Sequence, residues 1–200
     1  KENDDTFSRK FLFKEKRFYL LVLNTVVTPF LLTGLFFFQT ALADYKNWSI
    51  EWLSLCFVGY AIGRVLFSLI SGPLIDKYSA TKLLPLYLLP FLSGLILLLI
   101  TDHMYVGMYY LFATGISVGF GSIIKTASIA EIYGSENLGG IRSVFSTLKV
   151  FGTALSPVLF GFLMDNGYSF SFIIIFGIIV LSTIVLLNTQ YVAQFKFAFN

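Results

Sequence analysis

Three basic side chains fall inside, or at the end of, stretches of this sequence that are otherwise apolar enough to cross a bilayer. Arg64 lies near the middle of one such stretch, Lys149 lies within a second, and Lys125 lies at the inner end of a third. A charge at mid-bilayer costs at least about 2.5–3.5 kcal/mol on insertion scales, so such a side chain usually faces a wet cavity or a counter-charge. No Asp or Glu occurs deep in any of these stretches. For Arg64 we therefore favour a cavity over a structural ion pair.

Polar side chains one helical turn away extend these charged positions into faces. Tyr60 and Ser68 lie four residues to either side of Arg64 and share its helical face. The face of Lys149 continues through Ser146, Thr153 and Ser156. For Lys149, a cavity position and snorkelling to the headgroups stay equally open, and snorkelling is favoured more for Lys125 than for Arg64 or Lys149.

The chemistry of these groups indicates an anionic ligand. A guanidinium binds a planar carboxylate or phosphate in bidentate fashion, and an ammonium acts as a mobile point charge. A cavity with these bases and no acid attracts an anion and repels a cation. We expect a small organic anion as substrate, and the candidate substrate-binding residues are Arg64, Lys149, Tyr60, Thr153 and Lys125.

The elements that position these residues are membrane-spanning helices. Of the 200 residues, 56% are hydrophobic and 12% are charged, which excludes an ordinary soluble domain. Stretches free of charge, or with one base each, predict six spans of about the length that a bilayer requires. These are residues 18–43, 52–75, 83–101, 103–124, 143–164 and 166–195. The expected fold class is an all-α integral membrane protein.

The distribution of Lys and Arg predicts the orientation. If the first span starts in the cytoplasm, only Lys46 of the 14 basic residues falls in a loop on the opposite side. Cytoplasmic loops carry the excess of Lys and Arg, so both termini are expected in the cytoplasm and the protein in the cell (inner) membrane. We divide the chain into a cytoplasmic linker or tail at 1–17, a six-helix bundle at 18–190 and a cytoplasmic tail at 191–200.

A short internal repeat relates the two halves of the bundle. Gly72-Pro-Leu-Ile-Asp76 ends the second span, and Gly161-Phe-Leu-Met-Asp165 ends the fifth. Because these spans run in opposite directions, the match predicts two inverted three-helix repeats, an architecture typical of secondary transporters. The third span of each triplet carries no ionisable side chain in its interior, and we expect both to form lipid-facing scaffold.

An enzyme is the competing class of function. Gly115-Ile-Ser-Val-Gly119 matches the Gly-x-Ser-x-Gly pattern of hydrolases, which suggests an intramembrane serine hydrolase with Ser117 as nucleophile. The sole histidine, His103, is about 20 Å away along the helix, and the strand-to-helix turn of the elbow is missing. We favour close helix packing through Gly115, Gly119 and Gly121, and no enzymatic activity.

Other ligand classes fail by residue count or by motif. One Cys, one His and no intramembrane carboxylate cannot form a metal site, and no phosphate-binding glycine loop followed by Lys-Ser/Thr occurs. We therefore expect no metal and no cofactor. Although the net charge is +3, the basic residues sort by membrane side, so no nucleic-acid partner is expected and the lipid bilayer is the surrounding partner.

Several motifs resemble one family. The loop Gly72-Pro-Leu-Ile-Asp76-Lys77-Tyr-Ser-Ala-Thr-Lys82 resembles the Gly-x-Leu-x-Asp-Arg-x-Gly-Arg-Arg signature of the major facilitator superfamily. Ala-Ile-Gly63-Arg64 and Ala130-Glu131-Ile-Tyr-Gly134 are also similar to that superfamily. The resemblance implies half of a major facilitator fold, the C-terminal six helices, with the N-terminal six-helix half missing as a partner.

The resemblance also implies a substrate class. An arginine in helix eight and a lysine in helix eleven resemble the substrate-binding pair of oxalate/formate antiporters, and monocarboxylate transporters share the arginine; Arg64 and Lys149 lie in those helices. This implies transport of a small organic anion such as a monocarboxylate by alternating access, with proton symport or anion exchange. The alternative within transport is a carrier for a sugar or drug, whose bases would pair with the missing half.

The resemblance further suggests a gate at the cytoplasmic end. Asp76 is expected to accept hydrogen bonds from the start of the fifth helix near Ile141, or to pair with Arg142, and so to hold the outward-open state. The candidate gating residues are Gly72, Asp76, Lys77, Glu131 and Arg142. The alternative is a set of solvated surface charges of little energetic weight.

Overall fold

The computed structural model describes residues 15–134 and 138–197, which are helical and contain no strand. Six helical segments within them are long and apolar enough to cross a membrane. They are α2 (Lys16–Phe37), α4 (Ile50–Tyr78), the segment Ala80–Ile100, α7 (Tyr105–Tyr133), α8 (Leu138–Asp165) and α9 (Phe170–Phe197). The prediction of six spans in an all-α fold is confirmed. Most of the expected tail at 1–17 and the last residues of the tail at 191–200 lie outside the described residues.

The first span ends earlier than the hydropathy predicts. Helix α2 stops at Phe37, and Phe38 leaves the helical region with φ −104° and ψ 33°. A separate short helix, α3 (Gln39–Lys46), follows and ends at Asn47 in the left-handed conformation. The predicted boundary at residue 43 is wrong because apolar residues continue across the break, and a hydropathy pattern does not register a change of helix direction.

The third span is interrupted near its start. It consists of α5 (Ala80–Leu83), one 3₁₀ turn η1 (Leu86–Leu88) and α6 (Leu89–Ile100). Pro85 precedes η1, and Pro90 occupies the first turn of α6. Proline lacks an amide proton and fits the first helical turn, so the chain changes helix type here.

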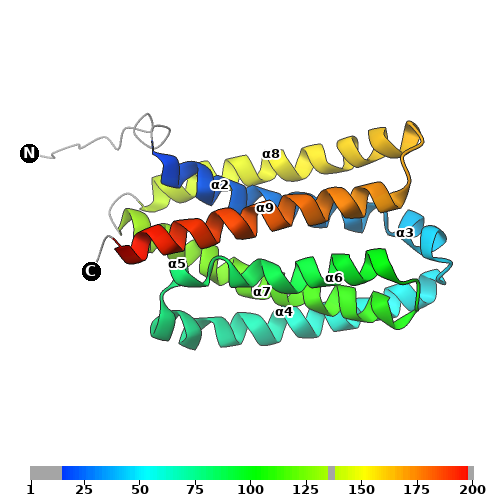
Figure 1. The fold of residues 1–200 in the computed structure, drawn as a ribbon, viewed down its shortest axis with the longest axis horizontal. Helices are drawn as coiled ribbons and strands as arrows, with labels where there is room; N and C mark the ends of the chain where they lie inside the picture. The colour runs from blue at the N-terminus through cyan, green and yellow to red at the C-terminus, as the bar shows by residue number, and fades with distance from the viewer. Residues whose placement is uncertain (1–14, 135–137, 198–200) are drawn as a thin grey trace, which may run out of the picture.

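Three of the helix pairs agree with an inverted repeat. The most extensive contacts are those of α4 with α7 and of α2 with α8, and α6 packs on α9. In an inverted repeat, α2, α4 and α6 correspond to α7, α8 and α9. The α4–α7 pair therefore corresponds to the α8–α2 pair, and the α6–α9 pair corresponds to itself. Figure 1 shows α4 and α8 on opposite edges of the bundle, with α2 beginning and α9 ending at the same end of it. We call this the terminal end.

Glycines bring α4 and α7 into backbone contact. A Cβ on Gly115 would overlap the carbonyl of Tyr60, and a Cβ on Gly119 would overlap the carbonyl of Arg64. From the other side, a Cβ on Gly63 would lie 2.6 Å from the carbonyl oxygen of Phe112. Small residues at a helix interface permit this approach. The predicted packing through Gly115 and Gly119 is confirmed.

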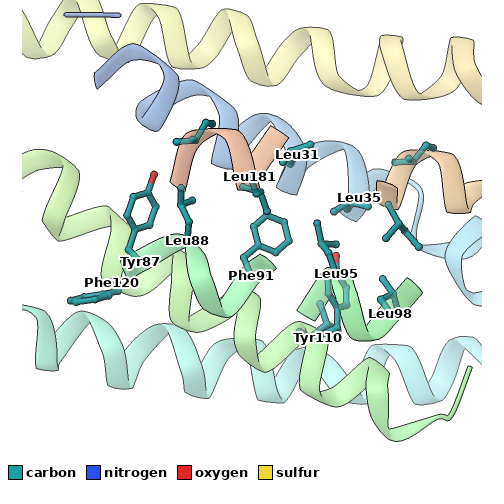
Figure 2. Close-up of a cluster of buried hydrophobic side chains, with 14 of the residues drawn as sticks. Leu31, Leu35, Tyr87, Leu88, Phe91, Leu95, Leu98, Tyr110, Phe120 and Leu181 are labelled. Carbon is teal, nitrogen blue, oxygen red and sulfur yellow. The ribbon is translucent and has the colours of Figure 1, made fainter. Parts of the chain in front are cut away.

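A buried apolar layer joins the remaining helices. Figure 2 shows leucines of α2, among them Leu31 and Leu35, facing Phe91 and Leu95 of α6, with Leu181 of α9 between them. All five side chains are at most 2% exposed. This layer fixes α2, α6 and α9 relative to the α4–α7 pair, and so positions the faces of the bundle that carry polar side chains.

The end opposite the termini is closed by a polar cluster. Lys46 Nζ lies 2.5 Å from Asp102 Oδ1 and donates a second hydrogen bond to the Thr101 carbonyl. The indole N–H of Trp48 donates to the Asp102 carbonyl at 2.8 Å, and that of Trp52 to the Met104 carbonyl at 2.8 Å. Lys46, which the sequence places in an outer loop, is therefore buried against the α6–α7 turn.

Candidate functional site

One cavity of about 510 Å³ lies among four of the spans. Its lining comes from the middle of α2 and α4, the second half of α7 and the first half of α8. The polar members are Thr25, Thr28, Thr33, Tyr60, Arg64, Ser122, Lys125, Thr126, Arg142, Ser146, Lys149 and Thr153. Neither α6 nor α9 contributes a lining residue, which agrees with the scaffold role expected of the third span in each triplet.

The cavity concentrates positive charge. Arg64, Lys125, Arg142 and Lys149 all line it, and no Asp or Glu of the described residues does. Within the described part of the chain, none of the four makes a salt bridge to a carboxylate. Like charges gathered without counter-charges give a positive potential that favours an anion.

Lys125 lines the cavity and contacts an aromatic ring. Its Nζ is 5.5 Å from the centroid of the Tyr87 ring, the range of a cation–π contact. Lys125 thus lies where its predicted substrate-binding role requires it, with the Tyr87 ring as a partner for its ammonium inside the bundle. Lys149 also lines the cavity, so the cavity position is the one it takes.

Not every residue of the predicted polar faces reaches the cavity. Tyr60 lines it beside Arg64, whereas the Ser68 hydroxyl donates to the Val65 carbonyl on the outside of α4. Ser146 and Thr153 line it beside Lys149. Ser156 is buried and donates a 2.5 Å hydrogen bond across to the Phe30 carbonyl of α2. The polar stripe of α8 thus divides into a cavity part and a helix-packing part.

Several hydroxyl groups of α2 and α7 line the cavity without having been predicted from the sequence. Thr25, Thr28 and Thr33 line it from α2, and Thr25 Oγ1 is buried without a hydrogen-bond partner among the described residues. A signal was present in α7, where Ser122 lies three residues before Lys125 and four before Thr126, so that it shares a helical face with both. A search for charges alone passes over such residues.

The predicted gate contact is not formed. Asp76 makes no hydrogen bond or ion pair with another described residue, and Arg142 lines the cavity instead. The physical reason is the placement of the two helices, because α4 and α8 occupy opposite edges of the bundle (Figure 1). A Cβ on Gly72 would meet no atom within 4 Å, and Lys77 Nζ lies 5.2 Å from the Tyr78 ring centroid. A gating role for these residues stays a prediction.

Glu131 has a different partner from the one a gate would require. Its carboxylate accepts hydrogen bonds from the backbone N–H groups of Ala80 and Thr81 at 2.7 and 2.9 Å. It also accepts from the hydroxyls of Ser79 and Thr81 at 2.9 and 2.7 Å. Ser79 has a positive φ of 73°, so this turn departs sharply from α4. Glu131 therefore fixes the α4–α5 turn to the end of α7.

Ser117 occupies a structural position. Its hydroxyl is fully buried and accepts a 2.9 Å hydrogen bond from the backbone N–H of Phe91, in the first turn of α6. That amide has no partner within its own helix at this position. His103 lies in the turn before α7 and stacks on Tyr105. The pair that a hydrolase would need is not assembled, and among the described residues no group of three potential metal ligands occurs.

The sequence match agrees with the fold and the cavity. The family model described as the Major Facilitator Superfamily matches residues 21–194, so the chain belongs to the major facilitator superfamily. Its members are transporters, and this chain is accordingly a secondary transporter of the membrane and not an enzyme. No curated protein matches the chain as a relative.

Proposed function

We propose that this transporter carries a small organic anion, such as a monocarboxylate, bound in the cavity between α2, α4, α7 and α8. The observation that carries the proposal is the charge of the lining, which has four bases and no acid among the described residues. Hydrogen bonds to charged groups contribute about 1.5–3 kcal/mol each, so even two such contacts would give useful affinity for a small carboxylate.

Each lining group has a distinct part in this proposal. Arg64 supplies a fork of N–H donors that matches a carboxylate, and Lys149 supplies a second cation across the cavity on α8. Lys125 adds a third positive charge from α7. The hydroxyls of Tyr60 and Thr153 are neutral donors beside the bases. Arg142 lies two helical turns before Lys149, about 10 Å nearer the start of α8, and would meet the anion as it enters from the terminal end.

A second six-helix bundle is proposed as the partner of this face. Arg64 and Lys149 are both exposed, and a charge within a span cannot face lipid without a large cost. A partner half would enclose the cavity between the bundles, and rocking of one half on the other would give alternating access with proton symport or anion exchange.

The orientation in the cell membrane is part of the same proposal. The terminal end holds Lys77, Lys82 and Arg142, and the opposite end holds Lys46, whose charge is neutralised by Asp102. The excess of Lys and Arg on one side supports a cytoplasmic location for the terminal end, and therefore for both termini.

Uptake of lactate into liposomes by the full-length protein tests the proposal, with glucose as the uncharged comparator. We expect Arg64→Gln and Lys149→Gln each to raise the KM for lactate roughly tenfold or more, since each removes a charged contact. Lys82→Gln, which removes an exposed charge outside the cavity, serves as the matched control. Unchanged lactate uptake by both cavity variants, or uptake of glucose in preference to lactate, would contradict the anion proposal.

A further inference from the structure

The cavity base Lys125 is connected to a buried polar network that the proposed function does not use. The network joins Asn24 of α2, Tyr87 of η1 and Asn188 of α9, each at most 1% exposed. Buried polar groups within membrane spans are costly unless they are paired. Three of them meeting at one point therefore call for a physical account.

The side-chain amides of the two asparagines are fully hydrogen-bonded. Asn24 Nδ2 donates to Asn188 Oδ1 at 2.8 Å, and Asn188 Nδ2 donates to Asn24 Oδ1 at 2.9 Å. The remaining amide protons go to the Leu20 carbonyl at 2.9 Å and the Leu84 carbonyl at 3.2 Å. The pair thus binds α2 to α9 and to the residue preceding Pro85.

Tyr87 is held by this pair at its hydroxyl. The Tyr87 hydroxyl lies 3.0 Å from Asn24 Oδ1 and 3.1 Å from the Asn24 carbonyl, and it donates to these acceptors. Thr28, which lines the cavity, lies 3.4 Å from the same hydroxyl. Figure 2 shows the Tyr87 ring extending from its helical turn toward α2 and α9, with the hydroxyl at the far tip.

The ring face of Tyr87 is fitted to α7. A Cβ on Gly121 would lie 2.5 Å from Tyr87 Cδ2, so the absence of a side chain there makes room for the ring. Lys125 follows Gly121 by four residues and lies on the same face of α7. The Lys125 ammonium consequently sits over the ring, 5.5 Å from its centroid.

We infer that Tyr87 is a positioning residue that seats the Lys125 ammonium in the cavity, with the Asn24–Asn188 pair fixing the ring and Gly121 making room for it. The contact with the ring orients a flexible side chain that no carboxylate among residues 15–134 and 138–197 holds. It thereby reduces the loss of side-chain entropy when an anion binds. The contribution of this ammonium to anion binding rests on the proposed function, whereas the seat itself does not.

A spectroscopic test reads the seat directly. Reductive ¹³C-methylation of the lysines of the full-length protein places methyl groups on Lys125 Nζ, and the current of an aromatic ring shifts nuclei above its face upfield. We expect one upfield methyl signal, assigned by its absence from Lys125→Arg. Tyr87→Phe keeps the ring and should retain the signal, whereas Tyr87→Leu should abolish it.

Phe91→Leu is the matched control, because Phe91 is an equally buried aromatic residue of the following helix with no part in the cavity. It should leave the upfield signal in place. If Tyr87→Leu does not fold, Gly121→Ala provides the same test, because its methyl group would displace the ring without changing Tyr87. A Lys125 signal that is not upfield, or that persists unchanged in Tyr87→Leu or Gly121→Ala, would overturn the inference.

Lactate uptake separates this inference from the proposed function. Tyr87→Leu should raise the KM for lactate roughly threefold to thirtyfold, the range of a desolvated cation–π contact, with a smaller change in kcat. Tyr87→Phe should have the same KM for lactate as the parent, and Phe91→Leu should not raise that KM. A Tyr87-dependent signal in a parent protein that takes up no anion would support the seat and contradict the proposed function. Anion uptake together with a Tyr87-independent signal would support the proposed function and contradict the seat.

Discussion

Gly119 packs against the backbone of Arg64, so that a methyl group at residue 119 would overlap the Arg64 carbonyl. The position of the guanidinium along the bundle is therefore set by a backbone contact between α4 and α7. The same contact recurs one turn away between Gly115 and Tyr60. Two residues that line the cavity thus have their backbones fixed by glycines that the cavity itself does not include.

Gly119→Ala should accordingly lower both stability and transport. Overpacking a tight contact costs about 1–3 kcal/mol. The atoms that the added methyl group would meet belong to the Arg64 backbone, which cannot move aside as the end of a flexible side chain could. The apparent Tm in detergent should fall by several degrees, and the KM for lactate should rise as Arg64 shifts. Gly139→Ala is the control, because no atom lies within 4 Å of the added group. Equal Tm values for the two variants would contradict the packing argument.

Glu131→Ala should loosen the α4–α5 turn. The substitution leaves two backbone N–H groups and two hydroxyls without their acceptor, at a cost of about 1–3 kcal/mol. Amide hydrogen exchange at Ala80 and Thr81 should accelerate strongly in the variant. Glu51→Ala, at an exposed position in the first turn of α4, should leave that exchange unchanged. Protection at Ala80 and Thr81 equal to that of the parent would show that Glu131 is dispensable for the turn.

The Lys46–Asp102 pair should respond asymmetrically to substitution. The Lys46 side chain is 1% exposed and the Asp102 side chain is 77% exposed. Asp102→Ala leaves a buried ammonium without its counter-charge, whereas Lys46→Met leaves a carboxylate that water can solvate. We expect the Asp102 variant to be the less stable of the two in thermal unfolding, by about 1–3 kcal/mol. The opposite ranking would mean that the apolar stem of Lys46 contributes more to stability than its charge does.

Ser117→Ala should behave as a packing variant. It removes the acceptor of the buried Phe91 N–H, at a cost of about 1–3 kcal/mol, and should lower the Tm while lactate uptake persists. A fluorophosphonate probe for activated serines should label neither the parent nor the variant. Labelling of Ser117 in the parent would revive the hydrolase alternative.

The sequence was sufficient to predict the spans and the glycine contacts, because both depend on local composition. Apolar length sets the number of crossings, and small residues at helical spacing set where two backbones approach. The break at Phe38 was not predicted, since apolar residues lie on both sides of it. Arg142 was assigned to a gate because its place at a helix start does not reveal which helix it faces.

The polar network could be predicted only in part. An asparagine within an apolar span needs a partner, so Asn24 and Asn188 signal a helix contact even before the fold is known. Which residues they bind depends on how α2, α9 and η1 meet in space. The seat of Lys125 on Tyr87 likewise joins residues far apart in the chain, and no periodicity of either segment specifies it.

Since no described residue of α6 or α9 lines the cavity, their exposed apolar side chains are available to contact the surrounding lipid. Residues such as Ile100, Ile179 and Leu186 are exposed and apolar, and their depth range sets the hydrocarbon thickness that the bundle matches. Lengthening or shortening this apolar belt would adapt the protein to a thicker or thinner bilayer while leaving its ligand chemistry untouched.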